Sequence, residues 1–342
     1  MKDRFVAVPS FQRVRMDGER PPGPGPTVER LALAAEFGPL ARLVASADVT
    51  DVFVNAGAEV WADRGSGLAR TDVGDLDPAE TRDLAVRLVA LGGRHVDEAT
   101  PCADVRLGGG VRVHVVLPPI SPSGTLLSIR LPPERRLSLD DLAASGMFDG
   151  DPSRLDRLVR AVGARANLLV TGAGGSGKTT LLGALLGAAP ADERIVTIED
   201  VAELRIDHPH VVGLQSRQAN VEGAGDLGLE RLLRESLRMR PDRLVLGECR
   251  GAEVRELLAA LNTGHDGGAG TLHANSLDDV PARLEALGAL SGMTPMALAR
   301  QAVSAIGLVI HVERDGGSRR IAEVGRLALA PDGRLAVKRT DW

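Results

Sequence analysis

The sequence predicts an α/β fold, in which a larger domain with a parallel sheet follows a smaller α+β domain. The chain has 342 residues, which suits two domains of roughly 150 residues each. Strand and helix patterns alternate from residue 138 onward, as in parallel sheets that are covered by helices. Prolines at 21–26 and in 131–137 mark boundaries. We therefore expect a flexible Pro/Gly arm at 1–27, an N-terminal domain at 28–130, a linker at 131–137 and a second domain at 138–342.

The composition is that of an ordinary soluble protein and excludes several classes. Hydrophobic residues make up 44% and charged residues 25% of the chain, so a sizeable core is available. The net charge of -5 and an aromatic content of 2% disfavour a nucleic-acid-binding surface. Two cysteines form no disulfide framework, and we see neither a signal peptide nor a membrane span. These features favour a cytoplasmic protein that meets membranes only through partners.

The N-terminal domain is expected to contain two helices and a set of short strands. The segment 28–47 has an amphipathic helical pattern, and 78–91 begins with a proline and is followed by two glycines. Glycines 108–110 separate two alternating runs and predict a hairpin. The expected strands are 51–55, 59–63, 103–107, 111–116 and 125–130.

The second domain is expected to alternate apolar strands with amphipathic helices. The strands are expected at 167–171, 194–198, 211–215, 243–247, 269–273 and 306–312. The helices are expected at 153–163, 178–188, 229–239, 252–262, 278–288 and 295–304.

A phosphate-binding loop lies between the first of these strands and the helix that follows it. The segment GAGGSGKTT, residues 172–180, matches G-x-x-x-x-G-K-T in its required context. Glycines let several backbone N–H groups face one phosphate chain, and the helix adds its positive end. Lys178 supplies a charge for the β- and γ-phosphates, and Thr179 supplies a hydroxyl for Mg²⁺. The nucleotide-binding set comprises Gly172, Gly174, Gly175, Ser176, Gly177, Lys178, Thr179 and Thr180.

Acidic residues end two later strands. Glu199, Asp200 and Glu203 follow the strand at 194–198, at the sheet edge where ligands bind in such folds. They either orient a water and hold Mg²⁺ or form a capped, solvated turn. Glu248 ends an apolar strand about 70 residues after Lys178, as a Walker B acid does. Glu248 is thus expected to reach Mg²⁺ or its water, the alternative being a surface acid.

A histidine ends the strand at 269–273. His273 either senses the γ-phosphate or serves as a structural hydrogen-bond donor, and the residues alone leave both readings open. Cys102 and Cys249 each stand apart from the histidines, so no zinc-site spacing is present.

Four segments, in order, resemble the secretion ATPases of the type II/type IV pilus superfamily. They are GAGGSGKTT, TIEDVAEL, RMRPDRLVLGECRGAE and GHDGGAGTLHANS, which match that family's Walker A, Asp box, Walker B and His box. The TadA/CpaF-type ATPases of tight-adherence pili are the most similar branch. The resemblance also takes in TDVFVNAGAEVWADRGSGL and DVRLGGGVRVHVVLPPISPSGTLLSIR of the first domain. Cys249 departs from the aliphatic residue expected there, and the arm replaces a longer helical extension.

The resemblance implies a RecA-like ATPase domain and a ring hexamer that converts ATP hydrolysis into domain motion. Glu199 and Glu203 become the Asp-box acids, either of which activates water, while Glu248 and Thr179 hold Mg²⁺. His273 becomes the His-box sensor. Arginines are expected to reach the γ-phosphate from the N-terminal domain or a neighbouring protomer, with Arg130 and Arg217 ranked ahead of Arg112 and Arg240.

The implied setting is the inner face of the cytoplasmic membrane, where polytopic platform proteins would be the partners and nucleic acid would not. The expected activity is ATP hydrolysis that drives pilus assembly or protein export. Two alternatives stay open: a nucleotide-regulated scaffold that has lost hydrolysis, and a RecA-like motor that translocates nucleic acid.

Overall fold

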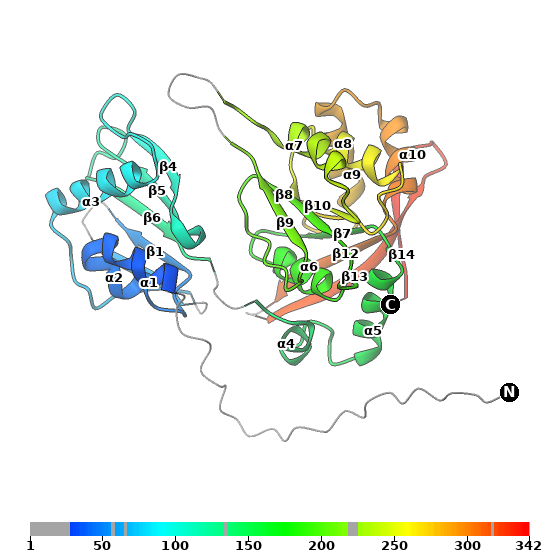
Figure 1. The fold of residues 1–342 in the computed structure, drawn as a ribbon, viewed down its shortest axis with the longest axis horizontal. Helices are drawn as coiled ribbons and strands as arrows, with labels where there is room; N and C mark the ends of the chain where they lie inside the picture. Colours follow the sequence, from blue (N-terminus) through cyan, green and yellow to red (C-terminus); the bar gives the residue numbers. More distant parts are fainter. Residues whose placement is uncertain are drawn as a thin grey trace.

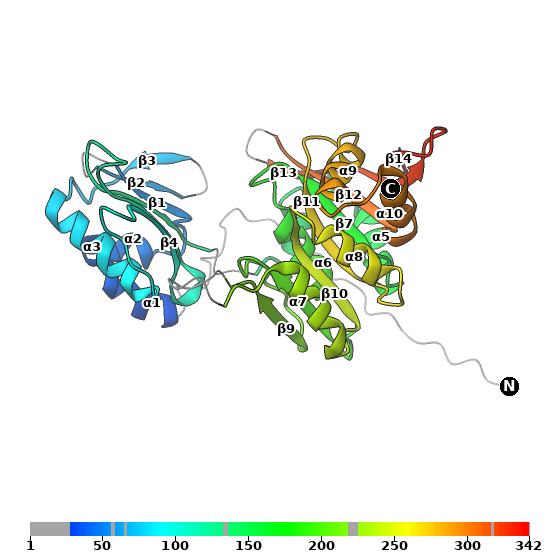
Figure 2. The same cartoon turned by 90° about the horizontal axis from the view of Figure 1, so that it is seen from above.

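The computed structural model describes residues 28–55, 59–64, 67–132, 136–217, 225–315 and 318–341. These residues form two β-sheets, each with its own helices, and the two lie side by side (Figure 1 and Figure 2). The expected arm at 1–27 and residues 133–135 of the expected linker lie outside the described residues. No helix in the described part of the chain is both long and apolar enough to cross a membrane.

The first sheet is antiparallel throughout and has the strand order β3-β2-β1-β6-β5-β4. Alternate residues of its strands, such as Val52 and Val54, are buried against helices that contribute Leu43, Leu84 and Leu88. Its strands are β1 Asp51–Val54, β2 Val60–Asp63, β3 Leu68–Arg70, β4 Cys102–Arg106, β5 Arg112–Val116 and β6 Leu126–Arg130. Its helices are α1 Val28–Ala34, the 3₁₀ turn η1 Ala35–Leu40, α2 Ala41–Val44, α3 Pro78–Leu91 and the 3₁₀ turn η2 Gly108–Gly110.

The first helical segment is broken, whereas its apolar periodicity predicts one helix. Gly38 takes a φ of 53° with ψ of -121°, a conformation that suits glycine, and Pro39 follows it without an N–H. The break turns Phe37 and Leu40 into the core, where both are fully buried. Strand β3 is also absent from the sequence prediction, because all three of its residues are exposed and it has no apolar alternation.

The second sheet has eight strands in the order β14-β13-β12-β7-β11-β10-β8-β9. The six strands from β12 to β9 in this order run parallel, as the alternating pattern predicts. Their bounds are β7 Leu168–Gly172, β8 Ile195–Glu199, β9 Val211–Gln215, β10 Arg243–Cys249, β11 Ala269–His273 and β12 Leu308–Asp315. The antiparallel strands β13 Ser318–Leu329 and β14 Leu335–Arg339 extend the sheet. Neither was predicted, because Arg319, Arg320 and Arg326 interrupt the apolar run of β13.

Helices cover both faces of this sheet and create two cores. One core packs α4 Leu139–Ala144, α5 Pro152–Gly163 and α6 Lys178–Gly187 against the sheet. The other packs α7 Leu229–Ser236, α8 Val254–Leu261, α9 Val280–Leu290 and α10 Pro295–Ala305, with the 3₁₀ turn η3 Leu237–Met239 after α7. Helix α4 was not predicted, although a capping box between Ser138 and Asp141 marks its start.

Candidate active site

The carboxyl ends of four parallel strands meet at one edge of the second sheet. In the order β7-β11-β10-β8 these ends carry Gly172, His273, Glu248 and Glu199. Residues that lie up to 101 positions apart in the sequence are therefore neighbours, as expected for a ligand site in this class of sheet.

The loop between β7 and α6 needs its glycines. Gly172, Gly175 and Gly177 have φ values of 150°, 70° and 101°, which other residues rarely adopt. A Cβ atom on Gly172 would lie 2.2 Å from the carbonyl oxygen of Val312. The curled backbone leads directly into the ten-residue helix α6, which begins at Lys178. A loop of this shape at a helix N-terminus is suited to an anion such as a phosphate group.

The ammonium group of Lys178 lies within this loop. Its Nζ donates to the carbonyl oxygens of Gly172 and Ala173 at 2.9 and 2.8 Å. Burial lowers the pKa of Lys178, and the charge of Glu248 opposes that effect. The lysine is therefore held at the loop rather than extended into solvent.

His273 at the end of β11 links Lys178 to Glu248 of β10. His273 Nδ1 lies 3.4 Å from Lys178 Nζ, and His273 Nε2 lies 3.0 Å from Glu248 Oε1. A neutral imidazole satisfies both contacts when Nε2–H donates to the carboxylate and Nδ1 accepts from the ammonium. The three side chains form a connected row, which we call the Lys178–His273–Glu248 row.

The acids of the Asp box are in three different environments. Glu199 is 5% exposed, and its Oε1 accepts hydrogen bonds from the backbone N–H groups of Glu203 and Leu204. Burial raises the pKa of Glu199, and these two hydrogen bonds oppose the rise. Asp200 forms an ion pair with Arg250. The side chain of Glu203 is exposed.

The four candidate arginines are not bonded to the Lys178–His273–Glu248 row in the described part of the chain. Arg130 is exposed and its Nε lies 3.4 Å from Asp51 Oδ1, while Arg112 Nη2 lies 3.2 Å from Asp104 Oδ2. Arg217 pairs through its backbone with Leu227, and Arg240 ends η3 in a left-handed conformation. Among the described residues, no hydrogen bond or ion pair joins any of the four to the row.

Three other arginines approach the site and were missed by sequence reasoning. Arg106 of the N-terminal sheet donates from Nη1 to Gln215 Oε1 at 2.9 Å, at the end of β9. Arg319 Nε donates to the carbonyl oxygen of Gly175 at 3.2 Å. Arg283 projects from α9. No motif marks these positions, and Arg106 and Arg319 reach the site only because strands that are distant in sequence bring them there.

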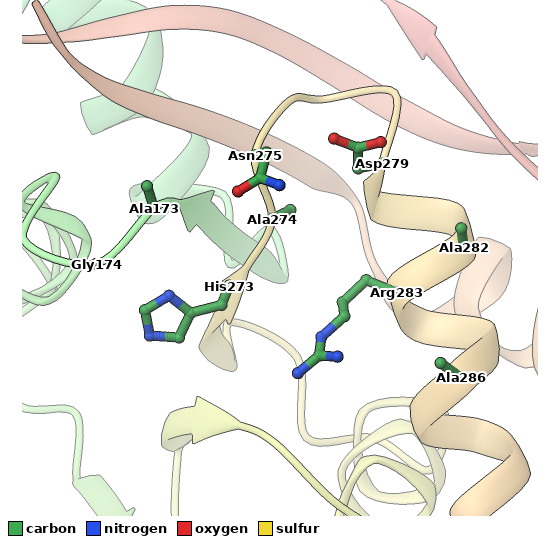
Figure 3. Close-up of a pocket in the computed structure, with 9 residues that line it drawn as sticks. All are labelled: Ala173, Gly174, His273, Ala274, Asn275, Asp279, Ala282, Arg283 and Ala286. Atoms are coloured by element: carbon green, nitrogen blue, oxygen red, sulfur yellow. The ribbon is translucent and has the colours of Figure 1, made fainter.

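A cavity of about 500 Å³ lies beside the loop. Figure 3 shows His273 pointing toward Ala173 and Gly174, and Arg283 reaching into the same space from α9. The remaining lining residues are Ala274, Asn275, Asp279, Ala282 and Ala286.

The residues at this edge fit Mg²⁺ that is bound together with a phosphate chain. Within the described ranges, no group of three or more His, Cys, Asp or Glu side chains could hold a metal ion. Mg²⁺ usually takes one or two protein oxygens and completes its shell with phosphates and water. Thr179, in the first turn of α6, and the half-buried Glu248 supply such oxygens. The buried Ser176 Oγ, which has no hydrogen-bond partner in the described residues, also faces this loop, since it lies 2.6 Å from the position of a Cβ on Gly172.

Cys249 belongs to the core rather than to the site. It is 2% exposed and packs among the apolar side chains between the sheet and helices α7 to α10. Burial raises the pKa of its thiol well above the usual range. The thiol thus replaces an aliphatic side chain.

Comparison of the sequence with known proteins identifies its family. Residues 34–321 match the family described as "Type II/IV secretion system protein". A protein of Mycobacterium tuberculosis that is provisionally named a conjugal transfer protein is 49% identical over 305 residues, which cover 87% of this chain and 86% of that protein. The type IV secretion system protein PtlH of Bordetella pertussis is 35% identical over 310 residues, covering 81% of this chain and 90% of PtlH.

A solved structure supports the fold assignment. The crystal structure of the pilus retraction motor PilT with bound ADP aligns with a TM-score of 0.59 and 21% sequence identity. The alignment covers 92% of this chain and 84% of PilT. The chain therefore has a RecA-like P-loop fold with a smaller N-terminal α+β domain, as the sequence predicted.

Proposed function

This chain belongs to the type II/IV secretion system protein family, and from that premise we propose that it hydrolyses ATP as the motor of a secretion or pilus-assembly machine. The Lys178–His273–Glu248 row beside the glycine-rich loop carries this proposal. Phosphoryl transfer requires a cation at the phosphates, an acid toward the metal and a precise arrangement of both. The row provides these groups within hydrogen-bonding distance of one another.

The loop and the first turn of α6 bind the triphosphate in this proposal. Lys178 leaves its contacts with the loop carbonyls to meet the β- and γ-phosphates. Mg²⁺, when bound, neutralises developing charge on the phosphate oxygens. Thr179 and Glu248 would hold it. The backbone N–H groups and hydroxyls that surround the phosphates belong to Gly172, Gly174, Gly175, Ser176, Gly177 and Thr180.

An Asp-box acid then acts on the attacking water, and His273 senses the phosphate. Hydrolysis forms a bond between the water oxygen and the γ-phosphorus and breaks the bond to the β-phosphate bridging oxygen. An Asp-box carboxylate, of Glu199 or Glu203, orients the water for in-line attack. His273 connects Glu248 to Lys178 and is thereby placed to report whether the lysine is engaged by phosphate.

The complete motor is proposed to be a ring of six copies. An arginine supplied by a neighbouring protomer raises the rate of many NTPases, and Arg130 and Arg217 are our candidates on the strength of the family resemblance. In the described residues neither makes a hydrogen bond or ion pair with the row of its own chain, which is compatible with a role at another copy's site.

The cellular role is proposed at the inner face of the cytoplasmic membrane. Relatives are named for type IV secretion and conjugal transfer. The branch that serves tight-adherence pili is our more specific proposal, with polytopic membrane proteins as partners that receive the domain motion.

Phosphate release by the full-length protein with Mg²⁺-ATP tests the enzymatic proposal. Lys178→Ala should lower turnover by about 10²-fold or more, because one preorganised charge at the transferred phosphoryl group is lost. Lys338→Ala removes the same charge from β14 and is the matched control, which should keep wild-type turnover. Equal rates in wild type and Lys178→Ala would contradict an ATPase that uses this loop.

A further inference from the structure

The Asp box contains two glutamates, and their surroundings differ sharply. Glu199 is the last residue of β8 and is buried, whereas Glu203 lies four residues later and is exposed. From the motif and the family resemblance alone, either glutamate could be the acid that activates the attacking water. The contacts of Glu199 separate their roles.

The carboxylate of Glu199 closes the backbone turn that carries Glu203. Its Oε1 accepts hydrogen bonds from the N–H of Glu203 at 2.8 Å and the N–H of Leu204 at 2.9 Å. Hydrogen bonds to an ionised acceptor are about twice as strong as those between neutral groups. The position of the Glu203 backbone therefore depends on the Glu199 side chain.

The side chain of Glu199 rests on a glycine of the neighbouring strand. Strands β8 and β10 pair at Ile198 and Leu246, and Gly247 comes next. A Cβ on Gly247 would lie 2.6 Å from Glu199 Cγ and 3.0 Å from Oε1. The carboxylate thus occupies the space that any larger residue at 247 would need, one residue before Glu248.

The Asp-box glutamates lie within electrostatic reach of a side chain from the N-terminal sheet. Burial lowers the pKa of Arg106, and the negative charges of Glu203 and Glu199 act in the opposite direction. Arg106 also donates to Gln215 at the end of β9.

We propose that Glu199 is a positioning residue whose carboxylate, packed against Gly247, fixes the backbone turn that carries Glu203. This proposal rests on the proposed ATPase function. Gly247 has a function as well in this proposal, because the Glu199 carboxylate fits against residue 247 only while that residue has no side chain.

Amide and alanine variants of Glu199 test the proposal in the full-length protein. Glu199→Gln keeps an Oε1 that accepts both backbone N–H groups, so turnover should stay within about five-fold of wild type. Glu199→Ala removes both backbone hydrogen bonds that hold the turn. Turnover should then fall by about 10²-fold, the scale expected when a reacting group is misplaced by about 1 Å. If Glu199→Gln is as inactive as Glu199→Ala, the proposal is overturned.

A double-mutant cycle tests the packing of the Glu199 side chain against Gly247. Gly247→Ala should lower turnover by about ten-fold in wild type but by less than about two-fold in Glu199→Ala, where the added methyl group enters vacated space. Losses that simply multiply would show that the two residues act independently and would contradict the proposal. Circular dichroism and thermal melting of each variant show whether it folds.

Amide hydrogen exchange gives a readout that needs no ATPase activity. The N–H groups of Glu203 and Leu204 should be protected in wild type and in Glu199→Gln, and should exchange faster in Glu199→Ala. Unprotected amides in wild type would overturn the positioning role. A protein with protected amides but no Lys178-dependent phosphate release would instead contradict the proposed function, so the two failures are distinguishable.

Discussion

At the residue scale, the site depends on side chains that only the fold brings together. Lys178, His273 and Glu248 come from three segments of the sequence and meet through contacts of 3.4 and 3.0 Å. His273 is the central member, because it touches both of the others. A change in the position or charge of Lys178 or Glu248 therefore affects His273, which contacts both.

Glu248→Gln is expected to separate binding from hydrolysis. The amide is nearly the same size and its oxygen still accepts from His273, but it cannot hold Mg²⁺ or its water as a carboxylate does. Turnover should fall on the order of 10²-fold while the affinity for a non-hydrolysable ATP analogue changes little. A binding titration and a phosphate-release assay on the same preparation measure the two effects.

The control for this variant is Glu98→Gln, an exposed acid of the N-terminal domain whose nearest ion-pair partner is Arg82 at 3.7 Å. It should leave both quantities unchanged. Parallel losses of binding and turnover in Glu248→Gln would show that Glu248 supports the structure of the site instead.

The residues of the candidate site could be named from the sequence, but its acids and arginines could not be ranked. The glycine-rich loop is predictable because its motif sits between an apolar strand and an apolar helix. Glu199 and Glu203 look equivalent in sequence, since only the backbone hydrogen bonds made by Glu199 distinguish them. Arg106 carries no signal, because its neighbour Gln215 lies 109 positions away.

At the element scale, the loop between β7 and α6 has backbone angles that favour glycine and is held by contacts with β12 and β13. Gly172 sits against the backbone of β12, and Arg319 of β13 donates to the carbonyl oxygen of Gly175. The unpredicted strand β13 therefore contributes directly to the shape of the loop. Its alternating charges hid it from a search for apolar strands, whereas the buried parallel strands were predictable from their continuous apolar runs.

Two neighbouring glycines of the loop should differ in their tolerance of a methyl group. Gly172→Ala would put a Cβ 2.2 Å from the Val312 carbonyl oxygen at a φ of 150°, so the free energy of unfolding should fall by about 2 kcal/mol and ATP binding should weaken. Gly174→Ala meets nothing nearer than His273 Cε1 at 3.9 Å and should be close to neutral in stability.

Denaturant unfolding of the two variants checks this prediction. Equal stability losses in Gly172→Ala and Gly174→Ala would mean that the loop is not packed against β12 in the way described. A loss confined to Gly172→Ala supports the loop geometry on which the phosphate site depends.

At the scale of the whole molecule, the two sheets make specific contacts next to the Asp box. Besides the Arg106–Gln215 hydrogen bond, Arg205 Nη2 donates to the carbonyl oxygen of Gly109 at 3.4 Å. The hairpin that holds Arg106 and Gly109 therefore touches the segment that follows Glu203. In the proposed motor, a movement of the N-terminal sheet would be transmitted to this segment.

In the proposed ring, assembly is a condition of activity, because the candidate arginines Arg130 and Arg217 would act at the site of a neighbouring copy. The most direct measurement is ATP turnover per chain over a range of protein concentrations, with sedimentation velocity on the same samples. Turnover should rise steeply as the ring forms, on the order of 10³-fold when an arginine arrives from a neighbour, and then reach a plateau. Turnover per chain that stays constant down to concentrations where sedimentation finds only monomer would contradict the account.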